Sequence, residues 1–193
     1  MPLILASSSA IRRHMLDAAA VEFEAIPSHV DEAAIKTELG TAERIALGLA
    51  EAKAVDVSRL RSADWVVGSD SVVSVDGRVF DKPTSRENAA EHLRLFSGEE
   101  MKLTSAVALA RGGAIDWSHA ETATLDVRPL SDAFIESYLA AEWPDVGYCV
   151  GVFRLEARGV QLFSAIDGNY FTILGMPLLP LLSALRERDL IPS

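Results

Sequence analysis

Hydrophobic residues recur along the chain with two different spacings. Some segments carry them in short runs or at alternate positions, which is typical of strands, and others carry them three and four residues apart, which is typical of helices. In the first half, the pattern predicts a strand at residues 3–6, a helix at 10–19, a strand at 21–27, a helix at 42–56 and a strand at 65–75. Asp76-Gly77 then marks a turn that predicts a hairpin.

The second half continues this mixture. Thr84 and Glu87 have the spacing of a capping box, so a helix is expected to begin just beyond Pro83. The pattern then predicts strands at 101–110 and 121–130 with a turn near 112–113, a helix at 132–141, strands at 161–166 and 170–175, and a last helix at 178–188. Hairpins mixed with crossovers predict an α/β fold with a mixed sheet flanked by helices.

Composition narrows the class of protein. The chain has 193 residues, 49% of them hydrophobic, and no internal repeat or compositional shift divides it, so we expect one domain over residues 1–193. A lone cysteine excludes an internal disulfide, and the four histidines lack the spacing of a zinc site. The apolar start lacks a basic leader and is broken by serines, which predicts a soluble cytoplasmic protein without a membrane partner.

The net charge of −10 repels nucleic acid and phosphorylated ligands on average, so an anion site must concentrate its cations locally. Arg12 and Arg13 follow Ser9 in the first turn of the first predicted helix, where the backbone already presents positive charge. A positive side chain at the N-terminus of a helix is unfavourable by about 0.3 to 1 kcal/mol, whereas a phosphate bound there would make the interaction favourable. The turn is therefore either an anion site or a pair of solvated arginines matched to acids elsewhere.

Strand alternation in residues 65–75 puts Asp70 on the same face as Val66, Gly68 and Val72. A carboxylate on an apolar face needs a partner, and a metal or a role as base would supply one, with Gly68 leaving room for a ligand. The alternative is a strand-end aspartate that makes turn hydrogen bonds.

Several other charged residues allow two interpretations. Lys53 falls on the apolar stripe of its helix, so its ammonium group either emerges at the edge of the stripe or enters a site. Lys82 lies in a loop, from which it could reach a phosphate or simply face solvent. Glu32 suits a helix start and could also supply an oxygen to Mg²⁺, and Glu156 is by default a surface carboxylate.

The short motifs that contain these residues follow one another in an order that resembles that of the Maf-like nucleotide pyrophosphatases. The resemblance is carried by LASSSAIRR, VDE at 30–32, LAEAKA, GSDSVV, DKP and ILGMPL, which span almost the whole chain. It implies a fold of the inosine-triphosphate-pyrophosphatase type, with a twisted mixed sheet and a long central cleft. It also implies hydrolysis of a nucleoside triphosphate to the monophosphate and pyrophosphate, a divalent cation (Mg²⁺ or Mn²⁺), and a homodimer.

The same resemblance assigns roles to individual residues. It makes Asp70 the catalytic base, Glu32 with Asp70 the metal-linked acids, Ser7, Ser9, Arg12, Lys53 and Lys82 the phosphate-binding positions, and Arg13 a less uniform basic position. The chemistry is coherent, because attack on a polyanion needs cations, a divalent ion and a base. An aspartate of ordinary pKa is a weak base for water, so we expect the metal to polarise that water.

Three positions distinguish subgroups of the family, and they correspond here to Ile11, Ser71 and Glu156. The dTTP/UTP group has Arg, Thr and Gln there, and the 7-methyl-GTP group has Trp, Gln and Glu. Glu156 therefore matches the second group, and a carboxylate can accept from the N–H donors of a guanine-type base. Ile11 lacks the cation–π face that tryptophan would offer a methylated base.

Two other classes of function compete with an enzyme. One is a nucleotide-binding regulator of cell division, since the family is associated with inhibition of septum formation. A sensor, however, has no need of Asp70 among phosphate-binding cations unless it handles a metal or a water. The other is a nucleic-acid-binding module, which the acidic net charge and the lack of an aromatic-basic patch oppose. A modified or purine-type nucleoside triphosphate is the expected ligand.

Overall fold

The structure is a computed structural model that describes residues 3–192, with the backbone alone for residues 37 and 38. The first half contains β1 (Leu3–Leu5), α1 (Ala10–Ala18), β2 (Phe23–Ala25), α2 (Glu32–Leu39), α3 (Ala42–Leu60), β3 (Trp65–Val75), β4 (Arg78–Phe80) and α4 (Arg86–Phe96). The second half contains β5 (Glu100–Arg111), β6 (Ala114–Val127), α5 (Asp132–Glu142), β7 (Phe163–Asp167), α6 (Tyr170–Leu174) and α7 (Leu178–Arg186), with three 3-10 helices between α5 and β7, namely η1 (Asp145–Tyr148), η2 (Val150–Val152) and η3 (Arg158–Leu162).

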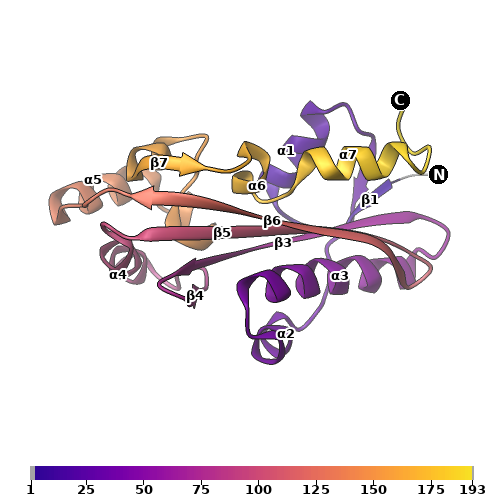
Figure 1. Cartoon of the computed structure of the whole chain (residues 1–193), viewed down its shortest axis with the longest axis horizontal. Coiled ribbons are helices and arrows are strands. Elements are labelled where there is room, and N and C mark those ends of the chain that lie inside the picture. The colour runs from indigo at the N-terminus through magenta and orange to yellow at the C-terminus, as the bar shows by residue number, and fades with distance from the viewer. Residues whose placement is uncertain (1–2, 193) are drawn as a thin grey trace. The chain divides into compact units, whose positions relative to one another are not determined.

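The strands pair in the order β2-β1-β3-β5-β6-β7, and β4 pairs with β3 outside this path (Figure 1). β1 runs parallel to β2 and to β3, whereas β4 is antiparallel to β3 and β7 is antiparallel to β6. The predicted α/β fold with a mixed sheet flanked by helices is confirmed.

The contacts of the chain divide it into two compact units. The first comprises Met1–Ser71, Thr104–Glu121 and Asn169–Ser193, and the second comprises Val72–Leu103 and Thr122–Gly168. The long strands β3, β5 and β6 contribute residues to both units.

In the first unit, helices cover both faces of the strands because side chains alternate along them. Leu3 and Leu5 of β1 pack into one apolar cluster with residues of α1 and α7. Ile4 and its neighbour Ala6 pack on the other face against Val57 of α3. Since both faces are covered, a charged side chain within β3 must find its partner inside the protein.

The second unit holds its 3-10 segments with polar contacts as well as aromatic ones. The rings of Phe153, which follows η2, and Phe163, which follows η3, meet edge to face. The hydroxyl of Tyr138 on α5 donates to the carbonyl oxygen of Val152 at 3.0 Å, and Val152 has a left-handed backbone with φ of 59°. A β-branched residue in that conformation is strained, so the buried hydrogen bond helps to hold it there.

Two predictions about secondary structure were wrong. Residues 170–175 form helix α6 and not a strand, because the Asn169 side chain accepts from the backbone N–H of Phe171 and Gly175, with φ of 112°, ends the helix. Helix α4 is capped by Ser85, whose hydroxyl accepts from the backbone of Asn88, so Thr84 is not the cap.

Other elements were missed or misjudged in length. Helix α2 was not predicted as an element, although its first residue, Glu32, was recognised as suited to a helix start. Strand β6 begins at Ala114, seven residues before the predicted start at residue 121, and α3 continues to Leu60. Among the helices within residues 3–192, none has both the length and the apolar character that a membrane crossing requires.

Candidate active site

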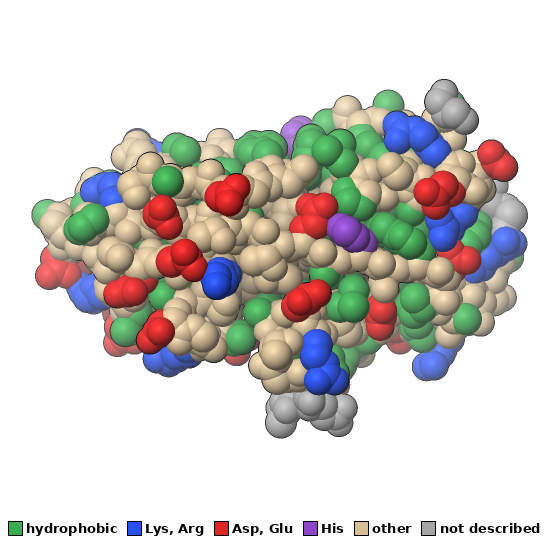
Figure 2. All heavy atoms as spheres, viewed as in Figure 1, with side chains coloured by type: hydrophobic (Ala, Val, Ile, Leu, Met, Phe, Trp, Pro, Cys, Tyr) green, Lys and Arg blue, Asp and Glu red, His purple; other side chains and the backbone are tan. Residues whose placement is uncertain are grey.

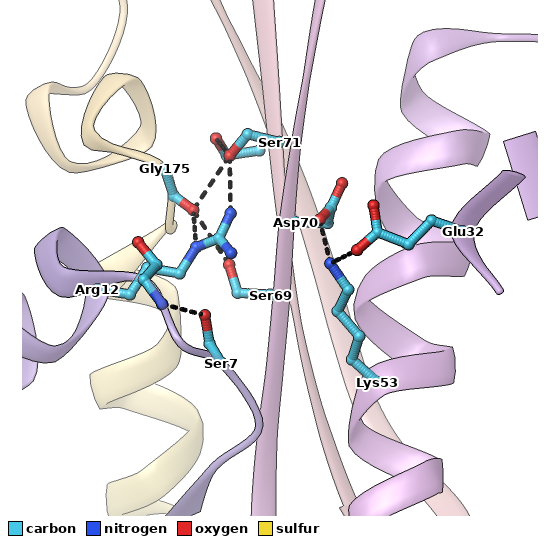
Figure 3. Close-up of polar contacts among 10 residues, drawn as sticks. Ser7, Arg12, Glu32, Lys53, Ser69, Asp70, Ser71 and Gly175 are labelled. Atoms are coloured by element: carbon cyan, nitrogen blue, oxygen red, sulfur yellow. Dashed lines mark hydrogen bonds and ion pairs between the residues drawn. The ribbon is translucent and has the colours of Figure 1, made fainter. Parts of the chain in front are cut away.

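The candidate site in the first unit is organised by the alternation of side chains along β3. Ser69 and Ser71 point to one side of the strand, toward α1 and the end of α6, and Asp70 points to the other side, toward α3 (Figure 3). The sequence predicted this alternation from the period of the strand. Two polar clusters therefore lie back to back across β3.

The first cluster consists of Asp70, Lys53 and Glu32. The ammonium nitrogen of Lys53 lies 2.5 Å from Oδ1 of Asp70 and 2.7 Å from Oε1 of Glu32. The Lys53 and Asp70 side chains are only 11% and 12% exposed, and Glu32 is 46% exposed. Lys53 therefore does not emerge into solvent at the edge of the helix stripe, and Asp70 is a buried carboxylate with an ionic partner rather than a strand-end turn residue.

Gly68 explains how Lys53 comes so close to Asp70. A Cβ at Gly68 would collide with the carbonyl oxygen of Ala50 and the backbone nitrogen of Ala54. Helix α3 thus packs with its backbone directly against β3 at this point. The expectation that Gly68 makes room for a ligand is wrong, because the space is filled by α3.

The second cluster is built around Arg12 of α1. Its Nε donates to the carbonyl oxygen of Gly175 at 2.9 Å and its Nη2 donates to Oγ of Ser71 at 3.2 Å. Burial lowers the pKa of the Arg12 guanidinium, and the negative charges of Asp70 and Glu32 oppose this shift. Arg12 is therefore held by the protein and is not a freely solvated arginine.

Two contacts on one edge leave the other edge of the Arg12 guanidinium available. A guanidinium carries five N–H donors, and the bonds to Gly175 and Ser71 use the edge formed by Nε and Nη2. Within the described part of the chain, Nη1 has no hydrogen-bond partner. The pair of donors formed by Nη1 and Nη2 is the fork that fits a phosphate.

The start of α1 supplies further donors beside Arg12. Ser9 occupies the N-cap position but its side chain caps no backbone N–H, and Oγ of Ser7 accepts from the Ser9 backbone at 3.2 Å. The first backbone N–H groups of a helix have no partner within it. Arg13 is exposed and Ile11 is half-buried. The structure thus separates the roles of the two arginines, of which only Arg12 is held in place.

The remaining predicted site residues belong to the second unit. Lys82 lies between β4 and α4, Glu156 lies between η2 and η3, and both are exposed. Burial raises the pKa of the Cys149 thiol to about 11; Glu156 adds to this rise and Lys82 opposes it. Both charges therefore act on one thiol, which places them in the same region of this unit.

Sequence reasoning missed four residues of the Arg12 cluster, namely Ser69, Ser105, Thr172 and Gly175. Ser69 and Ser105 are fully buried serines within mostly apolar strands, and that contrast was a usable signal. Gly175 stands in the ILGMPL segment but was assigned to a strand, which concealed its part as a carbonyl acceptor.

Charged side chains are dispersed on the face of the molecule that Figure 2 displays. Figure 2 shows acidic side chains spread over the face in view, with basic side chains between them rather than gathered in one patch. In residues 3–192, no group of three or more His, Cys, Asp and Glu side chains is arranged to hold a metal ion. Asp70 and Glu32, which both contact Lys53, are the two carboxylates that the site offers.

Comparison with known proteins adds to this geometry. The family model described as Maf-like protein matches residues 2–188. A 7-methyl-GTP pyrophosphatase of Rhizobium meliloti (strain 1021) is 48% identical, with 99% of this chain and 98% of the relative covered. A nucleoside triphosphate pyrophosphatase of Sphingopyxis alaskensis is 44% identical over the full length of both chains. Among solved structures, the Ham1 protein of Staphylococcus aureus matches with a TM-score of 0.48 and 12% identity over 66% of this chain and 72% of that one.

Proposed function

We propose that this protein, which belongs to the Maf-like family, hydrolyses a nucleoside triphosphate to the monophosphate and pyrophosphate at the site around Asp70. The observation that carries the proposal is the burial of Asp70 against Lys53, on the strand whose other face holds Arg12. A site that binds a polyanion without a metal gains nothing from a carboxylate, whereas hydrolysis needs a group that accepts a proton from water.

The cations of the first unit have separate tasks in this proposal. The free edge of Arg12 and the N-terminal N–H groups of α1 bind phosphate oxygens, because both are fixed donors before the ligand arrives. Lys53 offsets the negative charge of Asp70 and Glu32, so that a polyanion can approach two carboxylates. Asp70 takes the proton of the attacking water.

The residues present fit a divalent cation. Mg²⁺ is commonly held by one or two carboxylates together with phosphate oxygens of the substrate, and Asp70 and Glu32, which both contact Lys53, supply two carboxylates. We propose that these two residues hold Mg²⁺ or Mn²⁺, which when bound lowers the pKa of a coordinated water. The role of Asp70 itself is to orient the attacking water and receive its proton.

We propose further that Glu156 recognises the base and favours a guanine-type nucleotide such as 7-methyl-GTP. A carboxylate accepts from the N–H groups on the Watson–Crick edge of guanine, and 7-methylation adds a positive charge that it attracts. The relative that is 48% identical carries the name 7-methyl-GTP pyrophosphatase. Lys82, near Cys149 like Glu156, is proposed to contact the phosphates.

The test is pyrophosphate release in the presence of Mg²⁺ from a panel of ordinary and 7-methylated nucleoside triphosphates. Asp70→Asn is expected to lower kcat by about 100-fold or more, the usual contribution of a positioned base. Asp76→Asn, an exposed aspartate in the β3–β4 turn, is the matched control and should retain activity. Nucleotide binding without any turnover by the native protein would instead favour the regulator.

The same panel tests base recognition through Glu156→Gln. This substitution keeps the size of the side chain and removes one acceptor and the charge, so it should lower kcat/KM for 7-methyl-GTP by about 10-fold, the effect of one charged hydrogen bond. Turnover of dTTP or UTP with none of 7-methyl-GTP would remove this part of the proposal. The homodimer implied by the resemblance stays a prediction, which light scattering on the purified protein tests.

A further inference from the structure

One buried serine of the Arg12 cluster has no role in the proposed function. Ser105, in the middle of β5, is fully buried, and its Oγ lies 2.8 Å from Oγ of Ser71. The same hydroxyl lies 2.7 Å from the carbonyl oxygen of Thr172 in α6 and donates to it. Ser71 in turn accepts from Nη2 of Arg12. A chain of hydrogen bonds therefore leads from a deeply buried strand to the guanidinium.

The protons of this cluster can be counted. Three donors lie within hydrogen-bond distance of the carbonyl oxygen of Gly175, namely Nε of Arg12 at 2.9 Å, Oγ of Ser69 at 3.1 Å and Oγ of Ser71 at 3.2 Å. A carbonyl oxygen has two lone pairs. One of the three donors must therefore be directed elsewhere if the other two are to make good bonds.

Ser105 offers the Ser71 hydroxyl a second acceptor in place of the Gly175 carbonyl oxygen. When Ser105 donates to Thr172, its own oxygen is free to accept from Ser71 at 2.8 Å. Gly175 then receives two donors, and the Thr172 oxygen also receives two, since the Gly175 backbone N–H reaches it at 3.1 Å. The reverse arrangement, in which Ser105 donates to Ser71, would leave three donors at one carbonyl and one at the other.

We propose that Ser105 is a positioning residue for Arg12. Its oxygen accepts a hydrogen bond from the Ser71 hydroxyl, so that the Gly175 carbonyl oxygen accepts from Arg12 and Ser69 alone. The inference rests on the proposed function, because it assumes that Arg12 binds the triphosphate. Its effect is to keep the side edge of the guanidinium bonded to protein, so that the end edge is presented to phosphate in a fixed direction.

The far end of the chain is anchored as well. The hydroxyl of Thr172, which is fully buried, donates to Oε2 of Glu121 at 2.5 Å. Oε1 of Glu121 lies 3.1 Å from Nε2 of His119, so the carboxylate is held from two sides. Thr172 is thereby fixed to β6, and its carbonyl oxygen stays within reach of Ser105.

The first experiment measures kcat and KM for pyrophosphate release by Ser105→Ala. Without an acceptor at position 105, the Ser71 proton turns to Gly175 and competes with Arg12, so KM should rise about fivefold, less than the loss of a whole charged hydrogen bond, while kcat stays within about twofold. Ser58→Ala is the matched control, because Ser58 is also fully buried in this unit and its hydroxyl bonds to Val55 and Gly113, away from the Arg12 cluster. It should leave KM unchanged.

The double variant Ser71→Ala/Ser105→Ala separates positioning from general damage. Once Ser71 has no proton to redirect, removal of the Ser105 hydroxyl should have no further effect, so the KM of the double variant should equal that of Ser71→Ala. An equal rise in KM from Ser105→Ala in both backgrounds would overturn the inference. So would a KM for Ser105→Ala no higher than that for Ser58→Ala.

Ser105→Cys keeps the test decisive if Ser105→Ala fails to fold. A thiol fills nearly the same space but is a weak acceptor, so KM should again rise relative to the native protein. An unchanged KM in this variant would contradict the proposal. Failure of the proposed function would look different, because the native protein itself would then release no pyrophosphate from any nucleotide in the panel.

Discussion

The ammonium group of Lys53 lies 2.5 Å from Oδ1 of Asp70, in a position where both side chains are almost enclosed by protein. Lys53 also contacts Glu32, so one cation serves two carboxylates. Removing one partner of a buried ion pair leaves an uncompensated charge, and such a change commonly costs about 3 to 5 kcal/mol. Loss of Lys53 leaves two carboxylates without their cation, whereas loss of Asp70 leaves Lys53 paired with Glu32. The free energy of unfolding should therefore fall more when Lys53 is replaced than when Asp70 is replaced.

We expect Lys53→Met to destabilise the protein by about 3 kcal/mol, and Asp70→Asn to destabilise it less, because Lys53 then still pairs with Glu32. Urea unfolding curves measure both changes. Lys102→Met is the control, since Lys102 and its partner Glu100 are both more than half exposed and should contribute within about 0.5 kcal/mol. Equal losses in Lys53→Met and Lys102→Met would show that the buried pair does not stabilise the fold.

A second prediction concerns the contact between α3 and β3. Gly68→Ala places a methyl group against the backbone of Ala50 and Ala54, which cannot rotate away, so α3 must shift. Overpacking of this kind costs about 1 to 3 kcal/mol, and the shift should also lower kcat because it moves Lys53 from Asp70. Unfolding curves and pyrophosphate release provide the two readouts.

Gly48→Ala on the same helix is the matched control for that prediction. Its new methyl group would meet the end of the Leu39 side chain, which is flexible. Alanine is also more favourable than glycine inside a helix by about 1 kcal/mol. We therefore expect Gly48→Ala to be neutral or stabilising. A loss of stability as large as that in Gly68→Ala would show that the backbone contact at Gly68 is not the cause of the loss there.

A third prediction separates the adjacent arginines. Arg12→Lys keeps the charge but cannot bond Gly175 and Ser71 along one edge while presenting a second edge to phosphate, so KM for the triphosphate should rise about 10-fold or more. Arg13→Lys changes an exposed side chain and should alter KM by no more than about twofold. If the two variants behave alike, the held guanidinium is not the phosphate ligand that we propose.

The sequence was a good guide wherever a period alone determines the outcome. The alternation of β3 correctly grouped Asp70 with Val66, and Val66 does pack on the face that α3 covers. The charge argument at the first helix drew attention to Arg12 and Arg13 alike, and the structure holds Arg12 in place and leaves Arg13 exposed. In both cases local geometry decides the direction of the side chain, and local geometry is readable from spacing.

Long-range contacts account for what the sequence did not reveal. Nothing near Gly68 indicates that the backbone of Ala50 will lie against it, because that approach depends on how α3 packs on the sheet. Residues 170–175 are rich in strand-forming side chains, yet the Asn169 cap and the Gly175 terminus make them a helix. The carbonyl that holds Arg12 is 163 residues away in sequence, so no local pattern could pair the two.

The last prediction concerns the single thiol of the second unit. Burial raises the pKa of Cys149 from the ordinary 9.0 to about 11, and Glu156 and Asp145 add to the rise. At pH 8 the thiolate fraction should therefore be about 100-fold lower than that of an ordinary cysteine, since each pKa unit is a factor of ten. Alkylation by iodoacetamide in the native protein should be correspondingly slow and should accelerate as the pH approaches 11.

The raised pKa of Cys149 also determines how the stability of the protein changes with pH. In the unfolded chain the thiol ionises near its ordinary pKa, whereas in the folded chain it stays protonated up to about pH 11, so ionisation favours the unfolded state as the pH rises from 9 to 11. Cys149→Ser, which does not ionise in this range, should lose less stability than the native protein over that interval. Fast alkylation at pH 8, or identical stability profiles for the native and Cys149→Ser proteins, would show that the surroundings of this half-buried thiol do not raise its pKa.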